Sequence, residues 1–445
     1  MPIHDERAER ASREEIKALQ WDRLARMLER ARATNEFFRR HWRGARLESV
    51  TSFEAFAREI PTVEKADFVT DQAAHPPYGL RHAHALERRE PMFIATTSGT
   101  SGQGVETRLQ TAAEMDGMRE CYRYMFRWAG LERGDLVFVT IPIAMLAGGQ
   151  CEYLGAQGAG MTAVAIGNYD ARRKLDLIHR YRPKALLGST SYFGHLAAVA
   201  TARPPAEGLT CLLAGTEGSG WAWLRRMEEE WAVPVHDRFG FTQAATDHMF
   251  TCERGIGERG RPGMLHNVEP LYLLEVIDPA TGRHVKDGEK GRVVVTSLYH
   301  WDTHLVRCAT GDEAVYREPG YCACGRPFAG IEIATMTRVD DVRKVKGVNL
   351  FPPAVEDAVF SEPAIEEYQV VLSSSAGGAD VATARLMPKT ALDPESAAGL
   401  ARRMAESLRE RTGIGFAVEL VPPGTLARSE YKARRWKDER AHTRG

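Results

Sequence analysis

The sequence predicts an α/β protein in which a large N-terminal domain, made of α/β subdomains and a small β region, precedes a small α+β domain. Two observations support this organisation. Between residues 136 and 215, short β-type runs alternate with helical segments, which is typical of βαβ units and a mainly parallel sheet. From residue 355 onward, signals for helix, strand, strand, helix and strand follow in the order of a small α+β sandwich.

The chain begins with an amphipathic helical region. Apolar residues recur at roughly helical spacing over residues 14–42, among many arginines and glutamates. Prolines at 61, 76 and 77 then predict a loop-rich approach to the parallel-sheet region.

The parallel-sheet region has strand signals at residues 136–141, 161–166, 185–188 and 211–215, and a polar helix is expected at 171–181. Ligands bind at the carboxyl ends of such strands. Gly215, Thr216 and Glu217 follow one strand end directly and are therefore candidate binding residues.

The remaining elements complete the two domains. Residues 271–298 predict a β-hairpin within a small β region at about 250–335. The C-terminal unit should contain helices at 355–359 and 394–411 and strands at 368–372, 381–386 and 417–421. We place the domain boundary between residues 339 and 340.

The bulk composition indicates an ordinary globular protein. The 59 basic and 60 acidic residues give a net charge of -1, which favours neither nucleic acid nor a membrane surface as a partner. The charged N-terminus lacks the apolar core of a secretory signal, and no stretch is long and apolar enough to span a bilayer. We expect a cytoplasmic enzyme, monomeric or homodimeric, that acts on small molecules.

Residues 96–104 read Thr-Thr-Ser-Gly-Thr-Ser-Gly-Gln-Gly, a run suited to phosphate. Its glycines let backbone N–H groups approach an anion, and its hydroxyls add donors. The run lacks the Gly-Lys-Ser/Thr of a Walker A loop. Taken alone, it could equally be a flexible linker.

Four further segments accompany this run: Phe-Gly-Phe-Thr-Gln at 239–243, Ala-Thr-Gly-Asp at 309–312, the stretch from Thr337 to Pro352, and Arg-Ser-Glu-Tyr-Lys at 428–432. In this order and spacing, the chain resembles the adenylate-forming superfamily, specifically its phenylacetate-CoA ligase-like branch. Residues 33–40 and 60–67 resemble that branch as well, so the resemblance covers nearly the whole chain.

The resemblance implies a reaction in two halves. A carboxylate attacks the α-phosphorus of ATP to give an acyl-adenylate and pyrophosphate, and a thiol then attacks the acyl carbon. Catalysis of the first half is mostly positioning and electrostatic stabilisation of phosphate oxygens. The implied cofactors are ATP, Mg²⁺ and CoA or another thiol acceptor.

The resemblance also assigns roles to individual residues. Thr242 would bind the α-phosphate, and Asp312 and Arg338 would bind the ribose. Lys432 would place its ammonium between the carboxylate and the α-phosphate. The β- and γ-phosphate loop and the other nucleotide-binding residues would be Ser98, Gly99, Thr100, Ser101, Gly102, Gly215, Thr216, Glu217, Phe239 and Gly240. Without the resemblance, Asp312 could simply form a turn and Lys432 could be a solvated surface residue.

Two positions depart from the family pattern. Gln243 stands where the family has a Mg²⁺-binding glutamate, and it offers a carbonyl oxygen without charge. Tyr431 replaces the usual glycine before the catalytic lysine. The resemblance further implies that the C-terminal domain is mobile about Asp340 and presents a different face, around Lys346 and Gly347, for the thiol step.

Four residues predict a structural zinc site: Cys252, His266, Cys322 and Cys324. The Cys-X-Cys pair can direct two thiolates at one ion, and the order Cys, His, Cys-X-Cys-Gly-Arg recurs in the branch. Such a ligand set suits tetrahedral Zn²⁺. Cys308 competes for the fourth position. The odd number of cysteines argues against a disulfide framework.

The expected substrate is an aryl or arylalkyl carboxylic acid, as the branch implies. It should bind between the strand end at 141–142, the turn at 148–153 and the region 215–240. Tyr153, Phe241 and His248 are candidate pocket residues. Two alternatives remain open: transfer of the acyl group to a carrier-protein thiol or an amine, and a degenerate nucleotide-binding protein with little catalysis.

Overall fold

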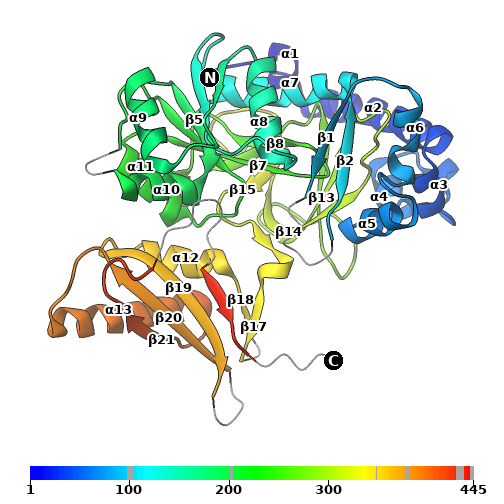
Figure 1. The fold of residues 1–445 in the computed structure, drawn as a ribbon. Coiled ribbons are helices and arrows are strands. Elements are labelled where there is room, and N and C mark those ends of the chain that lie inside the picture. The colour runs from blue at the N-terminus through cyan, green and yellow to red at the C-terminus, as the bar shows by residue number, and fades with distance from the viewer. Residues whose placement is uncertain (98–103, 201–203, 347, 376–379, 427–434, 441–445) are drawn as a thin grey trace.

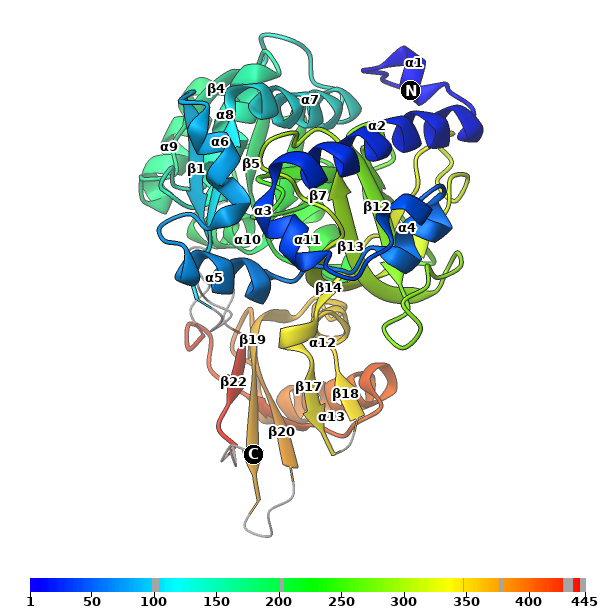
Figure 2. The same cartoon turned by 90° about the vertical axis from the view of Figure 1, so that its right-hand side faces the viewer.

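The computed structural model describes residues 1–97, 104–200, 204–346, 348–375, 380–426 and 435–440. A large unit holds the N-terminal three quarters of the chain, and a smaller unit lies beneath it (Figure 1). Helix α12 of the smaller unit faces the large unit in both views (Figures 1 and 2). No helix within the described ranges is long and apolar enough to cross a membrane.

The predicted amphipathic region is two helices, because the chain breaks at Asn35. Helix α2 spans Arg13–Thr34 and begins with a capping box between Ser12 and Glu15. Helix α3 spans Glu36–His41, and the Asn35 side chain accepts a hydrogen bond from the Phe38 N–H at 3.2 Å. The other elements before the sheet are α1 Glu6–Glu9, η1 Leu47–Ser49, α4 Phe53–Glu59, α5 Lys65–Ala74, η2 Leu80–His82 and α6 Ala83–Glu87.

The parallel sheet is confirmed. Strand β3 pairs in parallel with β4 and β5, and β5, β6 and β7 continue the parallel order. These strands are β3 Leu136–Val139, β4 Thr162–Ala165, β5 Ala185–Ser189, β6 Cys211–Gly215 and β7 Val235–Phe241. The helices around them are α7 Ala112–Trp128, α8 Ala147–Gly158, α9 Ala171–Tyr181, α10 Thr190–Val199 and α11 Trp221–Trp231.

The predicted hairpin is confirmed as β12 Tyr272–Ile277 and β13 Lys290–Ser297. Its sheet is continuous with the parallel strands, because β7 pairs antiparallel with β8 and the path runs on through β11, β15 and β14 to this hairpin. These strands are β8 Thr246–Thr251, β11 Met264–Asn267, β14 Cys308–Arg317, β15 Gly330–Glu332 and β16 Thr337–Arg338. Two short strands, β9 Gly257–Glu258 and β10 Arg261–Pro262, pair with each other.

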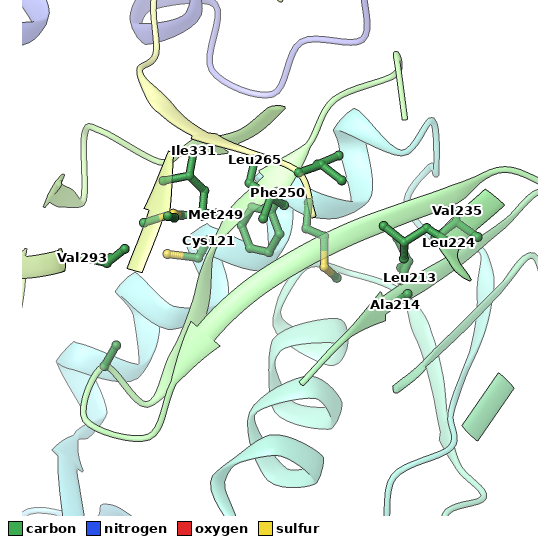
Figure 3. Packing of buried hydrophobic residues seen from close by; sticks show 14 of the residues in the cluster. Cys121, Leu213, Ala214, Leu224, Val235, Met249, Phe250, Leu265, Val293 and Ile331 are labelled. Atoms are coloured by element: carbon green, nitrogen blue, oxygen red, sulfur yellow. The ribbon is translucent and has the colours of Figure 1, made fainter. Parts of the chain in front are cut away.

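One apolar core joins the two halves of this sheet. Side chains of the parallel strands and of the antiparallel strands both belong to it, as Figure 3 shows. Cys121 of α7 lies in this core close to residues of β8 and is fully buried. The core residues labelled in the figure are Cys121, Leu213, Ala214, Leu224, Val235, Met249, Phe250, Leu265, Val293 and Ile331.

The C-terminal unit confirms the predicted order of helix, strand, strand, helix, strand. It comprises α12 Pro352–Phe360, β19 Ile365–Ser374, β20 Asp380–Pro388, α13 Pro394–Thr412 and β21 Ala417–Leu420. A further strand, β22 Trp436–Asp438, completes a sheet of order β21-β20-β19-β22. Before it lie η3 Val339–Asp341 and the hairpin of β17 Arg343–Val345 and β18 Val348–Leu350.

Polar contacts join the two units at the start of α11. The Gly220 N–H donates to the Glu356 carboxylate at 2.5 Å, and the Ala222 N–H donates to Asp357 at 2.9 Å. Glu356 and Asp357 belong to α12, so this helix docks on the segment that follows β6.

Candidate active site

The described residues on either side of the hydroxyl and glycine run form a hairpin. Strands β1 Met92–Thr96 and β2 Thr107–Thr111 pair antiparallel, with Thr96 opposite Thr107. Beyond them, the Thr97 N–H donates to the Glu106 carbonyl and the Glu106 N–H donates to the Thr97 hydroxyl, both at 2.9 Å. The hairpin therefore holds the two ends of the predicted phosphate loop together.

Several predicted residues fall outside the described ranges. They are Ser98, Gly99, Thr100, Ser101, Gly102, Gly347, Tyr431 and Lys432. Their roles stay predictions.

The end of β6 brings the predicted residues Gly215, Thr216 and Glu217 together. A Cβ on Gly215 would lie 2.6 Å from the Arg238 side chain, so only glycine fits here. Thr216 has a positive φ of 69° and lines a cavity. Glu217 accepts from the Thr190 hydroxyl at 2.9 Å and from the Ser191 N–H at 2.6 Å, so its carboxylate serves the N-terminus of α10.

Asp312 and Arg338 lie opposite each other on paired strands. Strands β14 and β16 place them in register, with 3.7 Å between Arg338 Nη1 and Asp312 Oδ1. Burial raises the pKa of Asp312 to about 6, and the Arg338 guanidinium opposes this rise. The pair presents one acidic and one basic side chain close together, as the predicted ribose site requires.

Gln243 lies in the turn between β7 and β8 and contacts a carboxylate. Its Nε2 donates a hydrogen bond to Glu106, which also forms an ion pair with Arg81 at 3.0 Å. All three side chains are buried. Burial raises the pKa of Glu106, while Arg81 and then the Gln243 hydrogen bond oppose the rise.

These residues fit a hard cation such as Mg²⁺ in the chemistry of their donors. Gln243 offers an amide oxygen, and Glu106 brings a carboxylate to the same place. The Glu106 carboxylate therefore contacts the side chain that stands where the family pattern has a glutamate. Sequence reasoning missed Glu106 and Arg81; the only available signal was a charged residue just beyond the glycine run.

A cavity of about 130 Å³ lies where the acid was expected. Its wall includes Gly148, Glu152, Thr216, Gly240 and Thr242, from the segments that the sequence pointed to. Phe241 also lines it, as predicted. Gly240 has no room for a side chain, because a Cβ would lie 2.3 Å from the Thr246 carbonyl oxygen.

Two predicted pocket residues, His248 and Tyr153, are not among the described residues that form the cavity wall. His248 is fully buried behind it, stacked on Tyr272 with ring centroids 4.4 Å apart. Tyr153 is half-buried on α8, and its hydroxyl accepts from Gln157 at 3.1 Å. Periodicity could not tell which face of α8 or β8 meets the cavity. Phe239 stacks on Phe241 at 6.2 Å and is likewise absent from this wall.

A buried cluster of charges forms part of the wall, and its pairing of Arg238 with Glu152 and Asp247 was not predicted from the sequence. The Arg238 guanidinium donates to Glu152 at 2.5 Å and also to Asp247. Tyr122 donates its hydroxyl to Asp247 at 3.2 Å. Burial raises the pKa of Glu152 to about 7, with Arg238 opposing the rise.

The four predicted zinc ligands lie together, with all ligand atoms within 4.8 Å of one another. The Cys252 and Cys322 sulfurs are 3.6 Å apart, and Cys324 Sγ lies 3.5 Å from His266 Nε2. Tetrahedral Zn²⁺ with its usual bond lengths spaces such atoms by about 3.5–3.8 Å. Cys308 is not part of this group.

The surroundings of this group also suit a metal. The N–H groups of Arg254 and Arg326 donate to the Cys252 and Cys324 sulfurs at 3.4 and 3.5 Å. His266 Nδ1 lies 3.3 Å from the Phe328 carbonyl oxygen, which leaves Nε2 directed at the sulfurs. Hydrogen bonds from Cys252 and Cys322 lower the pKa of Cys324, which favours its thiolate.

With this geometry established, similarity to known families defines the class of protein. Residues 17–299 match the family described as AMP-binding enzyme, and residues 347–440 match the AMP-binding enzyme C-terminal domain. The chain therefore belongs to the AMP-binding enzyme family.

Individual relatives place the chain in the phenylacetate-CoA ligase-like branch of the adenylate-forming superfamily. It is 26% identical to phenylacetate-coenzyme A ligase of Thermus thermophilus over 439 residues, which covers 94% of this chain and 95% of the relative. It is 25% identical to the phenylacetate-coenzyme A ligase of Pseudomonas putida, with 97% and 96% of the two chains covered.

Solved structures confirm the fold. The chain superposes on 2-hydroxyisobutyryl-CoA ligase in the postadenylation state, in complex with 2-HIB-AMP, with a TM-score of 0.88, 24% identity and coverage of 99% and 94%. Against the same ligase in the thioesterification state the TM-score is 0.68, at 24% identity and coverage of 98% and 91%. The two units of this chain are therefore arranged more like the postadenylation form.

Proposed function

We propose that this enzyme activates a carboxylic acid with ATP and transfers the acyl group to CoA. The observation that carries the proposal is the cavity that Thr216 and Thr242 share with the acyl-pocket residues, at the carboxyl end of β6. In an AMP-binding fold, this is a place where a carboxylate and an α-phosphate can meet. The names of the curated relatives support CoA as the acceptor.

In the first half-reaction, one carboxylate oxygen attacks the α-phosphorus and pyrophosphate leaves with its bonding electrons. Thr242 would donate to the α-phosphate, and residues 98–102 would hold the β- and γ-phosphates. Asp312 would accept hydrogen bonds from the ribose hydroxyls, with Arg338 beside it. Lys432 would offset the repulsion between the two anions.

Mg²⁺, when bound, would neutralise charge on the phosphate oxygens. Gln243 and Glu106 are the residues that would face it. Arg81 already compensates part of the Glu106 charge, so this chain would hold the ion with less free negative charge than one dedicated carboxylate supplies. Its affinity for Mg²⁺ should therefore depend more on the ATP phosphates and on water.

In the second half-reaction, the CoA thiolate attacks the acyl carbon and AMP leaves. We propose that the C-terminal unit turns about Asp340 between the two steps, with residues 1–339 and 340–445 as the moving bodies. The two units touch through polar contacts of Gly220 with Glu356 and of Ala222 with Asp357. The Trp223 ring also packs on Phe360 with ring centroids 4.3 Å apart, so the proposed turn must separate this interface.

We also propose that the acid is aromatic and that the cysteine and histidine group holds structural Zn²⁺. The aromatic acid is supported by the names of the relatives and by Phe241 in the wall. The zinc is supported by the ligand spacing and by the closed set of four ligands, which leaves no open position for chemistry. Its place beside β8 and β11 would tie the sheet to the N-terminus, because Arg326 next to Cys324 pairs with Glu9 at 2.9 Å.

Acid-dependent exchange of labelled pyrophosphate into ATP tests the adenylation step. We expect exchange with at least one acid of an aromatic panel without CoA, and thioester formation once CoA is added. Carrier protein and amines serve as alternative acceptors in parallel. Absence of exchange with every acid would refute the proposal and favour a nucleotide-binding protein without catalysis.

A further inference from the structure

The cavity wall combines an apolar side with a buried charged side. Phe241, Leu146 and Ala147 supply apolar surface, whereas Arg238, Glu152 and Asp247 supply charge. The cavity volume of about 130 Å³ suits one compact group, because an engineered cavity of about 150 Å³ holds a single benzene molecule. An acid whose body is purely hydrocarbon would form no hydrogen bond with the charged side of the wall.

The charged side has more acceptors than donors. One guanidinium faces two carboxylates, and the side chains of Arg238 and Glu152 are only 1% and 0% exposed. Within the described residues, Glu152 Oε2 is buried and has no hydrogen-bond partner. A buried carboxylate oxygen without a donor is unfavourable, and Glu152 is one of the residues that line the cavity.

Arg238 has little capacity left for an acidic ligand group. Its Nη1 donates to Asp247, its Nη2 to Glu152 and to the Gly188 carbonyl at 3.3 Å, and its Nε to the Leu213 carbonyl at 3.4 Å. These bonds use four of its five N–H groups, which disfavours a dicarboxylic acid. Asp247, with 14% of its side chain exposed, is the more accessible acceptor.

We propose that the acyl cavity selects acids that carry a hydrogen-bond donor, a hydroxyl or an amino group, on a compact apolar body. Glu152 and Asp247 receive the donor, Arg238 positions both carboxylates, and Phe241 packs on the apolar body. This inference rests on the proposed adenylation and names the substrate class of the same site.

The test compares acids of matched size on the wild-type enzyme. Phenylacetate and benzoate carrying a methyl, a hydroxyl or an amino group at each ring position are assayed by pyrophosphate exchange. We expect the best hydroxyl or amino acid to exceed its methyl counterpart in kcat/KM by about 100-fold or more, because a polar site rejects an analogue that leaves it unpaired. Equal or higher kcat/KM for the methyl acids would overturn the inference while leaving the proposed function intact.

Two conservative variants then show which carboxylate accepts the hydrogen bond from the ligand. Glu152→Gln and Asp247→Asn keep an acceptor oxygen but remove charge. We expect each to reduce the preference for amino over methyl acids by about 10-fold, mainly through KM, and to keep part of the preference for hydroxyl. Asp116→Asn, at an exposed position on α7 that pairs with Arg119, is the matched control.

Calorimetric binding of the same acids, in the presence of a non-hydrolysable ATP analogue, gives a readout that does not depend on catalysis. A donor-dependent affinity without exchange would refute adenylation and support the selectivity of the cavity. Affinity that ignores the donor in wild type would refute the selectivity even if the variants fail to fold.

Discussion

The side-chain amide of Gln243 donates a hydrogen bond to the buried carboxylate of Glu106. Glutamine at this position is the most conspicuous departure of the chain from its family pattern, and Glu106 explains why an amide stands there. A glutamate at 243 would place a second buried carboxylate against Glu106, with Arg81 as the compensating cation. The residues at 106 and 243 are therefore a coupled pair.

This coupling predicts the effect of restoring the family residue. Gln243→Glu should lower the free energy of unfolding by about 1–3 kcal/mol, because it replaces a hydrogen bond by a repulsive contact in a buried place. The swap Glu106→Gln with Gln243→Glu should recover most of that loss. Denaturant unfolding measures both, and Gln157→Glu on the exposed end of α8 is the control.

The same swap tests the Mg²⁺ assignment. If either residue can supply the carboxylate, the swapped enzyme should retain pyrophosphate exchange with a similar Mg²⁺ dependence, whereas Glu106→Gln alone should require more Mg²⁺. If the Mg²⁺ dependence of pyrophosphate exchange is the same in all of these variants, neither side chain approaches the ion.

Asp312 predicts a pH dependence of nucleoside binding. Its carboxylate must be ionised to accept from two ribose hydroxyls, and its pKa is raised to about 6 by burial. Adenosine affinity, which has no phosphate to titrate, should fall as the pH drops through 6. Asp312→Asn should bind adenosine weakly and without that titration; a wild-type affinity constant from pH 8 to pH 5 would contradict the assignment.

The free energy of unfolding should depend on the ionisation of Asp312 in the opposite direction, with greater stability at low pH. Because its folded pKa of about 6 exceeds its ordinary value of 3.8, the folded state holds the proton more tightly. The contribution of this group to stability is therefore greatest below pH 4 and is lost as the pH rises through 6. Comparing unfolding free energies of wild type and Asp312→Asn across this range isolates it.

The metal prediction concerns both content and stability. Purified protein should contain about one zinc per chain, as one tetrahedral site requires. Cys324→Ser should lose the metal and melt at a lower temperature, because the site forms only in the folded state. Cys308→Ala should keep the zinc, and loss of zinc in that variant would reopen the role of Cys308 as a ligand.

Arg435 links α12 to the sheet of the C-terminal unit, so its replacement should lower the free energy of unfolding. The guanidinium pairs with Glu367 at 2.7 Å and with Glu356, and it lies 4.8 Å from the Trp223 ring centre across the two units. Arg435→Met should cost about 3–5 kcal/mol, because two carboxylates are left without their cation. Adding Glu367→Gln should recover part of the loss, whereas Arg409→Met on the exposed face of α13 should cost little.

The regular elements could be predicted from sequence because their signals are local. The strand at 211–215 and the helix at 171–181 coincide with β6 and α9, since both have clear periodicity and end signals. The break at Asn35 was missed because helical spacing continues across it, while a side-chain cap and contacts distant in sequence hold the bend.

Some residues of the site could also be predicted from local motifs, whereas others could not. Motif order pointed to Cys252, His266, Cys322 and Cys324 as one group and to Asp312 and Arg338 as one site, and the structure brings the members of each set close together. Glu106 beside Gln243, and Glu152 beside Arg238, were not, because each pair joins residues about 90 or more positions apart through tertiary packing alone. His248 lies outside the cavity wall formed by the described residues, because sequence alone does not show which side of β8 faces the cavity.

The central claim is that an acid oxygen attacks the α-phosphorus of ATP, and an oxygen-labelled acid tests it most directly. The enzyme is supplied with ATP, CoA and an acid whose carboxylate oxygens are both ¹⁸O, and AMP is analysed by mass spectrometry. The account predicts one heavy oxygen in each AMP and none in the pyrophosphate, with Lys432→Ala giving no labelled AMP. Unlabelled AMP, or label in inorganic phosphate together with ADP, would contradict it.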